Sequence, residues 1–192
     1  MDKFVVVTDI DNCLNNLIEQ MFKIYNERNG TNYTINSLKS YSLSDNFDLK
    51  TTQNMQSMFL EKELWDSLTP VEGSQLALKS FVNDGYKVYA ATSTHHVNFP
   101  WKVDWMQKHF DFINPKDIIC IHDKSLLRCN VLVEDCYENL IKTSAMVDRV
   151  IINHPWNKAS KDRDYVYGIN RADNWEDAVK CINKIYKDEM EW

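Results

Sequence analysis

The amino-acid sequence predicts an α/β protein whose core is a Rossmann-like parallel sheet flanked by helices. Five short runs rich in β-branched and apolar residues recur along the chain: 4–9, 87–93, 117–123, 130–135 and 149–153. These runs are continuously apolar rather than alternating, a pattern typical of strands that are covered on both faces. Helical patterns lie between them, so we expect parallel strands joined by right-handed crossovers.

Amphipathic spacing identifies the helices. Apolar residues between Leu14 and Tyr25 follow the i, i+3, i+4, i+7 rule, which predicts a helix over 14–28 that stops near Gly30. Three further helices are predicted: 74–84, 101–110, and a last one that begins near the N-cap candidate Asn174. Each of these helices is long enough to cover part of the sheet.

One region breaks the alternation of strand and helix. Residues 15–69 contain the first helix, a polar stretch and a second helical segment over 53–64, but no convincing strand. We therefore expect a small helical cap at 15–69, inserted directly after the first strand. The core domain then consists of 1–14 and 70–192.

Composition excludes several classes of function. The chain has 192 residues, a formal net charge of -6 and a pI near 5.4, which disfavours a nucleic acid polymer as partner. No apolar run approaches the roughly 18 residues of a membrane span, so no membrane partner is expected. The four glycines form neither a dinucleotide-binding nor a Walker-type loop. Five cysteines without C-x-x-C spacing, and no recognisable signal peptide, favour a reduced, cytoplasmic location.

The chemistry is concentrated where the predicted strands end. In chain order the strands deliver these polar side chains: Asp9 and Asp11, then Thr92 and Ser93, then Lys124, then Glu134 and Asp135. Because ligands of open parallel sheets bind beyond the carboxyl ends of the strands, we expect this set to form one site.

If the ligand of this site is an anionic ester, electrostatics requires cations to bind it there. A phosphate monoester carries roughly two negative charges near neutral pH, and clustered carboxylates repel it unless cations intervene. Mg²⁺ prefers oxygen ligands and binds through one or two carboxylates together with a phosphate oxygen. Lys124 supplies one more positive charge, yet acids still outnumber cations, so one carboxyl group should be protonated at rest.

The ordered set of motifs resembles the haloacid dehalogenase-like (HAD) superfamily. The DIDN opening, the helical insert after it, and the ATS, HDK, VED and IINHPWN segments together resemble the 5'(3')-deoxyribonucleotidase family. The resemblance implies a HAD-like core and a Mg²⁺-dependent phosphatase that hydrolyses nucleoside monophosphates, in particular 5'(3')-deoxyribonucleotides. One position departs from the usual pattern, because Cys13 replaces Thr or Val. Cysteine is small and apolar, so we expect the packing to survive.

The resemblance also implies roles for the acids. Asp9 would attack phosphorus and form an aspartyl-phosphate. Asp11, the carboxyl group expected to be protonated, would protonate the leaving sugar oxygen and then activate water. Asp9, the backbone carbonyl of Asp11, and Asp135 would hold Mg²⁺, while Glu134 would act through a water or beside the ligands.

The remaining site residues are expected to bind the substrate. Thr92, Ser93 and Lys124 would hold the phosphoryl oxygens and stabilise charge in the transition state. Three aromatic residues of the insert are candidates to stack on the base: Phe22, Phe47 and Trp65. The competing interpretation places these rings in the small core of the insert itself.

Two other functions remain open at the level of sequence. The same core could serve a sugar-phosphate phosphatase or phosphotransferase, and only the insert separates that activity from a nucleotidase. A non-enzymatic receiver domain also uses acids, a hydroxyl residue and a lysine. There, however, the acids precede the lysine, whereas Glu134 and Asp135 follow Lys124. A small-molecule nucleotide is the expected partner, and a homodimer is left open.

Overall fold

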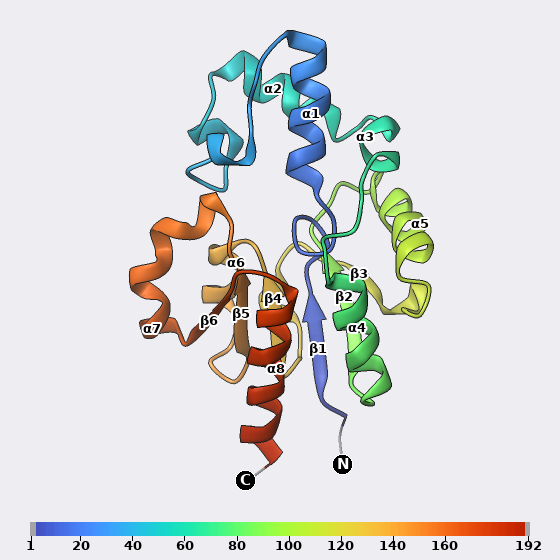
Figure 1. Cartoon of the computed structure of the whole chain (residues 1–192), viewed down its shortest axis with the longest axis vertical. Helices are drawn as coiled ribbons and strands as arrows, with labels where there is room; N and C mark the ends of the chain where they lie inside the picture. Colours follow the sequence, from blue (N-terminus) through green and yellow to red (C-terminus); the bar gives the residue numbers. More distant parts are fainter. Residues whose placement is uncertain (1–2, 191–192) are drawn as a thin grey trace.

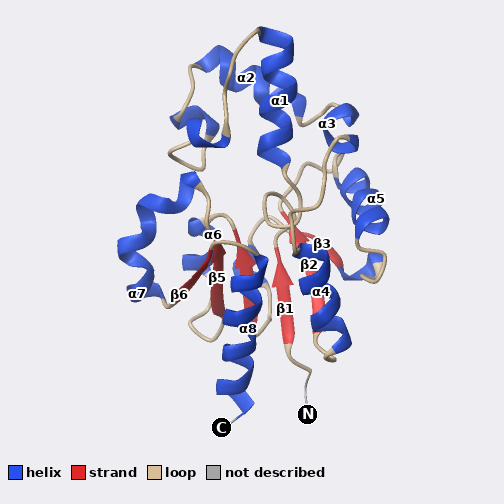
Figure 2. Cartoon of the chain, in the orientation of Figure 1, coloured by secondary structure: helices blue, strands red, loops and turns tan. Residues whose placement is uncertain are grey.

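The computed structural model describes residues 3–190 and is built around a six-stranded parallel sheet. Its strands are β1 (Val5–Thr8), β2 (Lys87–Thr92), β3 (Ile118–Cys120), β4 (Val131–Glu134), β5 (Asp148–Ile152) and β6 (Ile169–Ala172). They lie in the order β3-β2-β1-β4-β5-β6, and every neighbouring pair is parallel. Figure 2 shows these strands in the lower half of the molecule, between layers of helix. The α/β fold class is therefore confirmed.

Helices cover both faces of this sheet. Their bounds are α1 (Leu17–Asn29), α2 (Leu49–Met58), α3 (Lys62–Asp66), α4 (Ser74–Asn83), α5 (Phe99–His109), α6 (Tyr137–Lys142), α7 (Asp164–Tyr167) and α8 (Trp175–Met190). Residues of α4, α5 and α8 pack into the larger apolar cluster on one face, and α6 packs into a smaller cluster on the other. Within residues 3–190, no helix combines the length and apolarity needed to cross a bilayer.

One sequence prediction about the elements is wrong, and one strand was missed. The helix expected over 53–64 is two helices, α2 and α3, with a break between them. At this break the Phe59 carbonyl has no helical partner, and Trp65 Nε1 donates a hydrogen bond to it at 2.8 Å. Strand β6 was not predicted, because the polar residues Asn170 and Arg171 interrupt its apolar pattern. The predicted stop at Gly30 is confirmed by its left-handed φ of 64°.

The segment from α1 to α3 lies beyond the carboxyl ends of the strands. In Figure 1 these helices occupy the top of the view, above the end of β1 from which the chain enters them. The segment contains aromatic packing of its own, in which Phe22, Tyr33 and Phe47 meet with ring centroids 4.8 to 6.2 Å apart. The division into a core and a cap at 15–69 stays a prediction, but the segment is placed to cover the edge of the sheet where the acids lie.

Candidate active site

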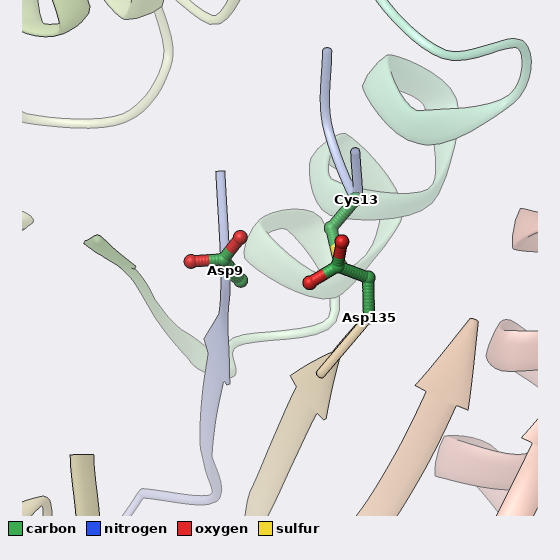
Figure 3. Close-up of side chains that lie close together, drawn as sticks. All are labelled: Asp9, Cys13 and Asp135. Carbon is green, nitrogen blue, oxygen red and sulfur yellow. The ribbon is translucent and has the colours of Figure 1, made fainter. Parts of the chain in front are cut away.

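The acids expected at the carboxyl edge of the sheet do meet there. Asp9 follows β1 and Asp135 follows β4, and these strands are neighbours. Oxygen atoms of both carboxylates and the Cys13 sulfur lie within 4.8 Å of one another. Figure 3 shows these three side chains close together, beyond the ends of the two strands. All three residues are buried, so the cluster belongs to the interior.

Lys124 lies between two buried acids, Asp9 and Glu134. It begins the short helix η4 (Lys124–Leu126) after β3, and its ammonium group bonds to Asp9 Oδ1 and, at 2.5 Å, to Glu134 Oε1. Only 3% of the Lys124 surface is exposed. A buried ammonium between two carboxylates is held in a fixed place. The role predicted for Lys124, binding a phosphoryl oxygen, requires a positive charge fixed in this way.

Glu134 has its bonding capacity fully used within the protein. Besides Lys124, its Oε1 accepts from Asn139 Nδ2 at 2.9 Å, and its Oε2 accepts from the backbone N–H groups of Asp135 and Cys136 at 3.2 Å each. Glu134 therefore positions Lys124 and the turn that carries Asp135. This arrangement fits a supporting role beside the ligands rather than direct contact with a metal.

Burial and mutual repulsion make the acids costly to ionise together. Burial raises the pKa of Asp9 to about 7, although the Lys124 ammonium opposes the shift. Burial also raises the pKa of Asp135 well above its usual value, with Asp9 and Glu134 adding repulsion. Burial opposes the charged form of Lys124, but its two carboxylate partners outweigh that and raise its pKa. The buried carboxylates thus outnumber the positive charge beside them. A divalent cation would offset the repulsion between these carboxylates.

The chemistry of the donors tests whether such a cation fits. Asp9 and Asp135 offer oxygen atoms, the ligands that Mg²⁺ prefers. Burial raises the pKa of the Cys13 thiol well above its ordinary value. Cys13, the third residue of the cluster, therefore stays protonated and is a poor metal ligand. Cys13 instead packs in the apolar core, which confirms the expected packing. The pair of carboxylates therefore fits a hard divalent cation.

Asp11 has a partner that sequence analysis missed. Lys102, on α5, bonds through its ammonium group to Asp11 Oδ2 and, at 2.6 Å, to Thr92 Oγ1. Lys102 is only 1% exposed, and Asn15 Nδ2 donates to the other Asp11 oxygen at 3.0 Å. Lys102 thus links the Asp11 carboxylate to the Thr92 hydroxyl, and Asp11 is not a member of the cluster formed by Asp9, Cys13 and Asp135. The expected proton on Asp11 and its backbone contact to a metal stay predictions.

The sequence does carry a signal for Lys102. This residue precedes Trp105 by three positions and Met106 by four, and both of these side chains are buried. A lysine on the buried face of an amphipathic helix requires a buried counter-charge. Helical spacing around the two apolar residues is therefore the pattern that could have identified Lys102 as a site residue.

A second overlooked group holds Asp135 in place. Asn12 Nδ2 donates to Asp135 Oδ2 at 3.1 Å, and Asn157 Nδ2 donates to the Asp135 carbonyl at 2.9 Å. Asn12 itself has a left-handed backbone with φ 58°, which asparagine tolerates better than most residues. His154 Nε2 lies 2.9 Å from the Asn12 carbonyl and stacks on Trp156 with ring centroids 4.2 Å apart. These contacts give a structural role to the IINHPWN segment.

A cavity of about 440 Å³ opens beside Asp11 and Lys102. Trp65 lines this cavity, and the Lys102 ammonium lies 5.0 Å from the centre of its ring. A contact between Trp65 and a base stays a prediction. Ser93 also lines the cavity and is exposed, with its hydroxyl 3.2 Å from His122 Nδ1. Phe59 and His95 also line the cavity.

Phe22 and Phe47 lie elsewhere. Phe22 is 1% exposed, and both rings pack with Tyr33 inside the helical segment. The competing interpretation, that these rings form the core of the insert, matches their observed packing. Of the three aromatic candidates, Trp65 is the one that the structure places on the cavity wall.

Comparison with known proteins identifies a family whose sequence model matches this chain. The model of the family described as "5' nucleotidase, deoxy (Pyrimidine), cytosolic type C protein" matches residues 3–187. The chain is 24% identical to a 5'(3')-deoxyribonucleotidase of Bacillus subtilis over 133 residues, which covers 68% of this chain and 72% of that protein. It is also 24% identical to a 5'(3')-deoxyribonucleotidase of Clostridium acetobutylicum over 140 residues, covering 73% and 77% of the two chains.

A solved structure shares the fold. The HAD family hydrolase of Deinococcus radiodurans, determined with bound phosphate and sodium, superposes with a TM-score of 0.58. The match covers 88% of this chain and 90% of that chain at 14% sequence identity, so it supports the fold alone. Together with the family match, it confirms a HAD-like core and contradicts the receiver-domain alternative.

Proposed function

Because the chain belongs to the 5' nucleotidase, deoxy (pyrimidine), cytosolic type C family, and is therefore a phosphoric monoester hydrolase, we propose that it hydrolyses deoxyribonucleoside monophosphates with Mg²⁺ as cofactor. The observation that carries this proposal is the pairing of Asp9 with Lys124 beside Asp135, at the edge of the sheet. The products would be a nucleoside and inorganic phosphate.

Asp9 is the proposed nucleophile. Its carboxylate is fixed by Lys124 and by the short connection from β1, so little freedom remains to be lost on reaction. Attack of a carboxylate oxygen on phosphorus breaks the bond to the sugar oxygen and forms an aspartyl-phosphate. Lys124 and the Thr92 hydroxyl would hold phosphoryl oxygens while charge develops on them.

Asp11 is the proposed acid and base. It gives a proton to the leaving sugar oxygen and then takes one from the water that cleaves the aspartyl-phosphate. Its contacts with Lys102 and Asn15 hold the carboxyl group at the mouth of the 440 Å³ cavity, where the sugar would lie. Lys102 also contacts Thr92, so it positions the acid and a phosphate-binding hydroxyl together.

Mg²⁺ would be held by Asp9 and Asp135, and when bound it would neutralise phosphate charge that the acids otherwise repel. Asn12 and Asn157 keep Asp135 in place for that purpose. The buried Glu134 completes the support by holding Lys124.

A panel of substrates tests this proposal. Deoxyribonucleoside 5'- and 3'-monophosphates, ribonucleoside monophosphates and sugar phosphates are compared by phosphate release with Mg²⁺ present. We expect nucleotides to be better substrates than sugar phosphates, because Trp65 and Phe59 offer aromatic walls to a base. Among nucleotides we expect the highest kcat/KM for a deoxyribonucleotide, in line with the family that the chain belongs to. Preference for a sugar phosphate would favour the sugar-phosphate phosphatase that the sequence left open, and no release from any ester would refute the proposal.

A further inference from the structure

A second cavity, of about 580 Å³, lies next to the first and contains none of the predicted site residues. Its walls come from three parts of the chain: the loop 39–45, helix α6, and the helix η5 (Pro155–Arg163). Figure 1 shows this loop extending from the segment that contains α1 to α3 toward the upper end of η5. A volume of this size lies within the usual range for small-molecule pockets.

The walls of this cavity are positively charged, although the whole chain is acidic. Lys39, Lys142 and Arg163 line it against two carboxylates, Asp45 and Glu138, whereas the chain carries a net charge of -6. None of the three cations forms an ion pair with a carboxylate in the part of the chain that the structure describes. Three cations from three different segments thus converge on one hollow.

Aromatic rings hold one of these cations at the wall. The Arg163 guanidinium lies 4.9 Å from the centre of the Tyr137 ring and 5.8 Å from the centre of the Tyr167 ring. Tyr137 is buried and lines the cavity, so its ring fixes the guanidinium beside the hollow.

We propose that this second cavity binds a phosphate-bearing small molecule, held by Lys39, Lys142 and Arg163. Free phosphate and a nucleotide share the chemistry that these groups recognise. Tyr41 and Trp156 line both cavities, so an occupant of the second cavity contacts a wall of the first. The site does not depend on the proposed phosphatase activity.

Titration in EDTA isolates this site. Without a divalent cation the acidic cluster should repel phosphate, whereas the second cavity carries its own positive charge. Inorganic phosphate and a deoxynucleoside triphosphate are therefore titrated separately into the whole protein, and binding is measured by calorimetry. We expect wild type to bind at least one of the two probes with one equivalent, and the probe that binds identifies the source of the anion.

Variants decide where the probe binds. Lys142→Gln combined with Arg163→Gln should weaken binding about tenfold or more, since each loses a charged hydrogen-bond donor. Lys116→Gln with Arg128→Gln removes the same charge away from the cavity and should leave affinity unchanged. No binding of either probe to wild type, or equal loss in the two double variants, would overturn the proposal.

Discussion

Replacing Lys102 by methionine tests whether this buried lysine positions the proposed acid. The change removes two hydrogen bonds from an ammonium group, to Asp11 and to Thr92. Bonds to charged groups each contribute about 1.5–3 kcal/mol, so the ceiling is about 3–6 kcal/mol. The Asp11 side chain keeps its bond from Asn15 and is 19% exposed, so water recovers part of the loss. We expect about 2–3 kcal/mol in activation free energy, a fall in kcat of about 30- to 150-fold.

The assay is steady-state phosphate release with saturating Mg²⁺ and the best substrate of the panel. Lys108→Met is the matched control, because it makes the same replacement on the exposed side of the same helix. Circular dichroism confirms that both variants fold. A Lys102→Met enzyme within threefold of wild type, measured beside an inactive Asp11→Asn enzyme, would refute the positioning role.

Three other outcomes follow from the charges in the site. Asp9→Asn should abolish turnover without unfolding the chain, and a fully active variant would refute the role of nucleophile. EDTA should stop phosphate release and Mg²⁺ restore it, whereas activity that survives EDTA would contradict the charge argument. The pKa of Asp9 is raised from 3.8 to about 7 without metal, so protons stabilise the metal-free fold as pH falls through 7. The gain in unfolding free energy from Mg²⁺, measured by urea titration, should therefore be larger at about pH 8 than at about pH 6; an equal gain would contradict the raised pKa.

Sequence predicted the centre of the site because buried strands make an unmistakable pattern. Each continuous apolar run ends at the edge of the sheet, and the acids follow two of these runs directly. Topology then brings Asp9, Lys124 and Asp135 together, although more than a hundred residues separate the first from the other two. The hydrophobic pattern alone was therefore enough to predict which residues follow these strands.

Other parts of the structure depend on tertiary packing, which the hydrophobic pattern of the sequence does not predict. Strand β6 is an edge strand with Arg171 in it, so it lacks the apolar run that identifies the central strands. Phe47 lies in a stretch without periodicity, and its packing against Tyr33, at 4.8 Å, depends on the fold of the whole insert. Lys102 was missed because only its spacing from Trp105 and Met106 places it on the buried face of α5.

A rapid-quench experiment tests the central proposal most directly. Wild-type enzyme is mixed with a deoxyribonucleoside monophosphate and Mg²⁺, stopped in acid, digested, and examined by mass spectrometry. We predict a phosphoryl group on the peptide that contains Asp9, in greater amount in Asp11→Asn if that change mainly slows the second step, and absent in Asp9→Asn. Turnover that continues while no phosphoryl group is found on Asp9 would contradict the account.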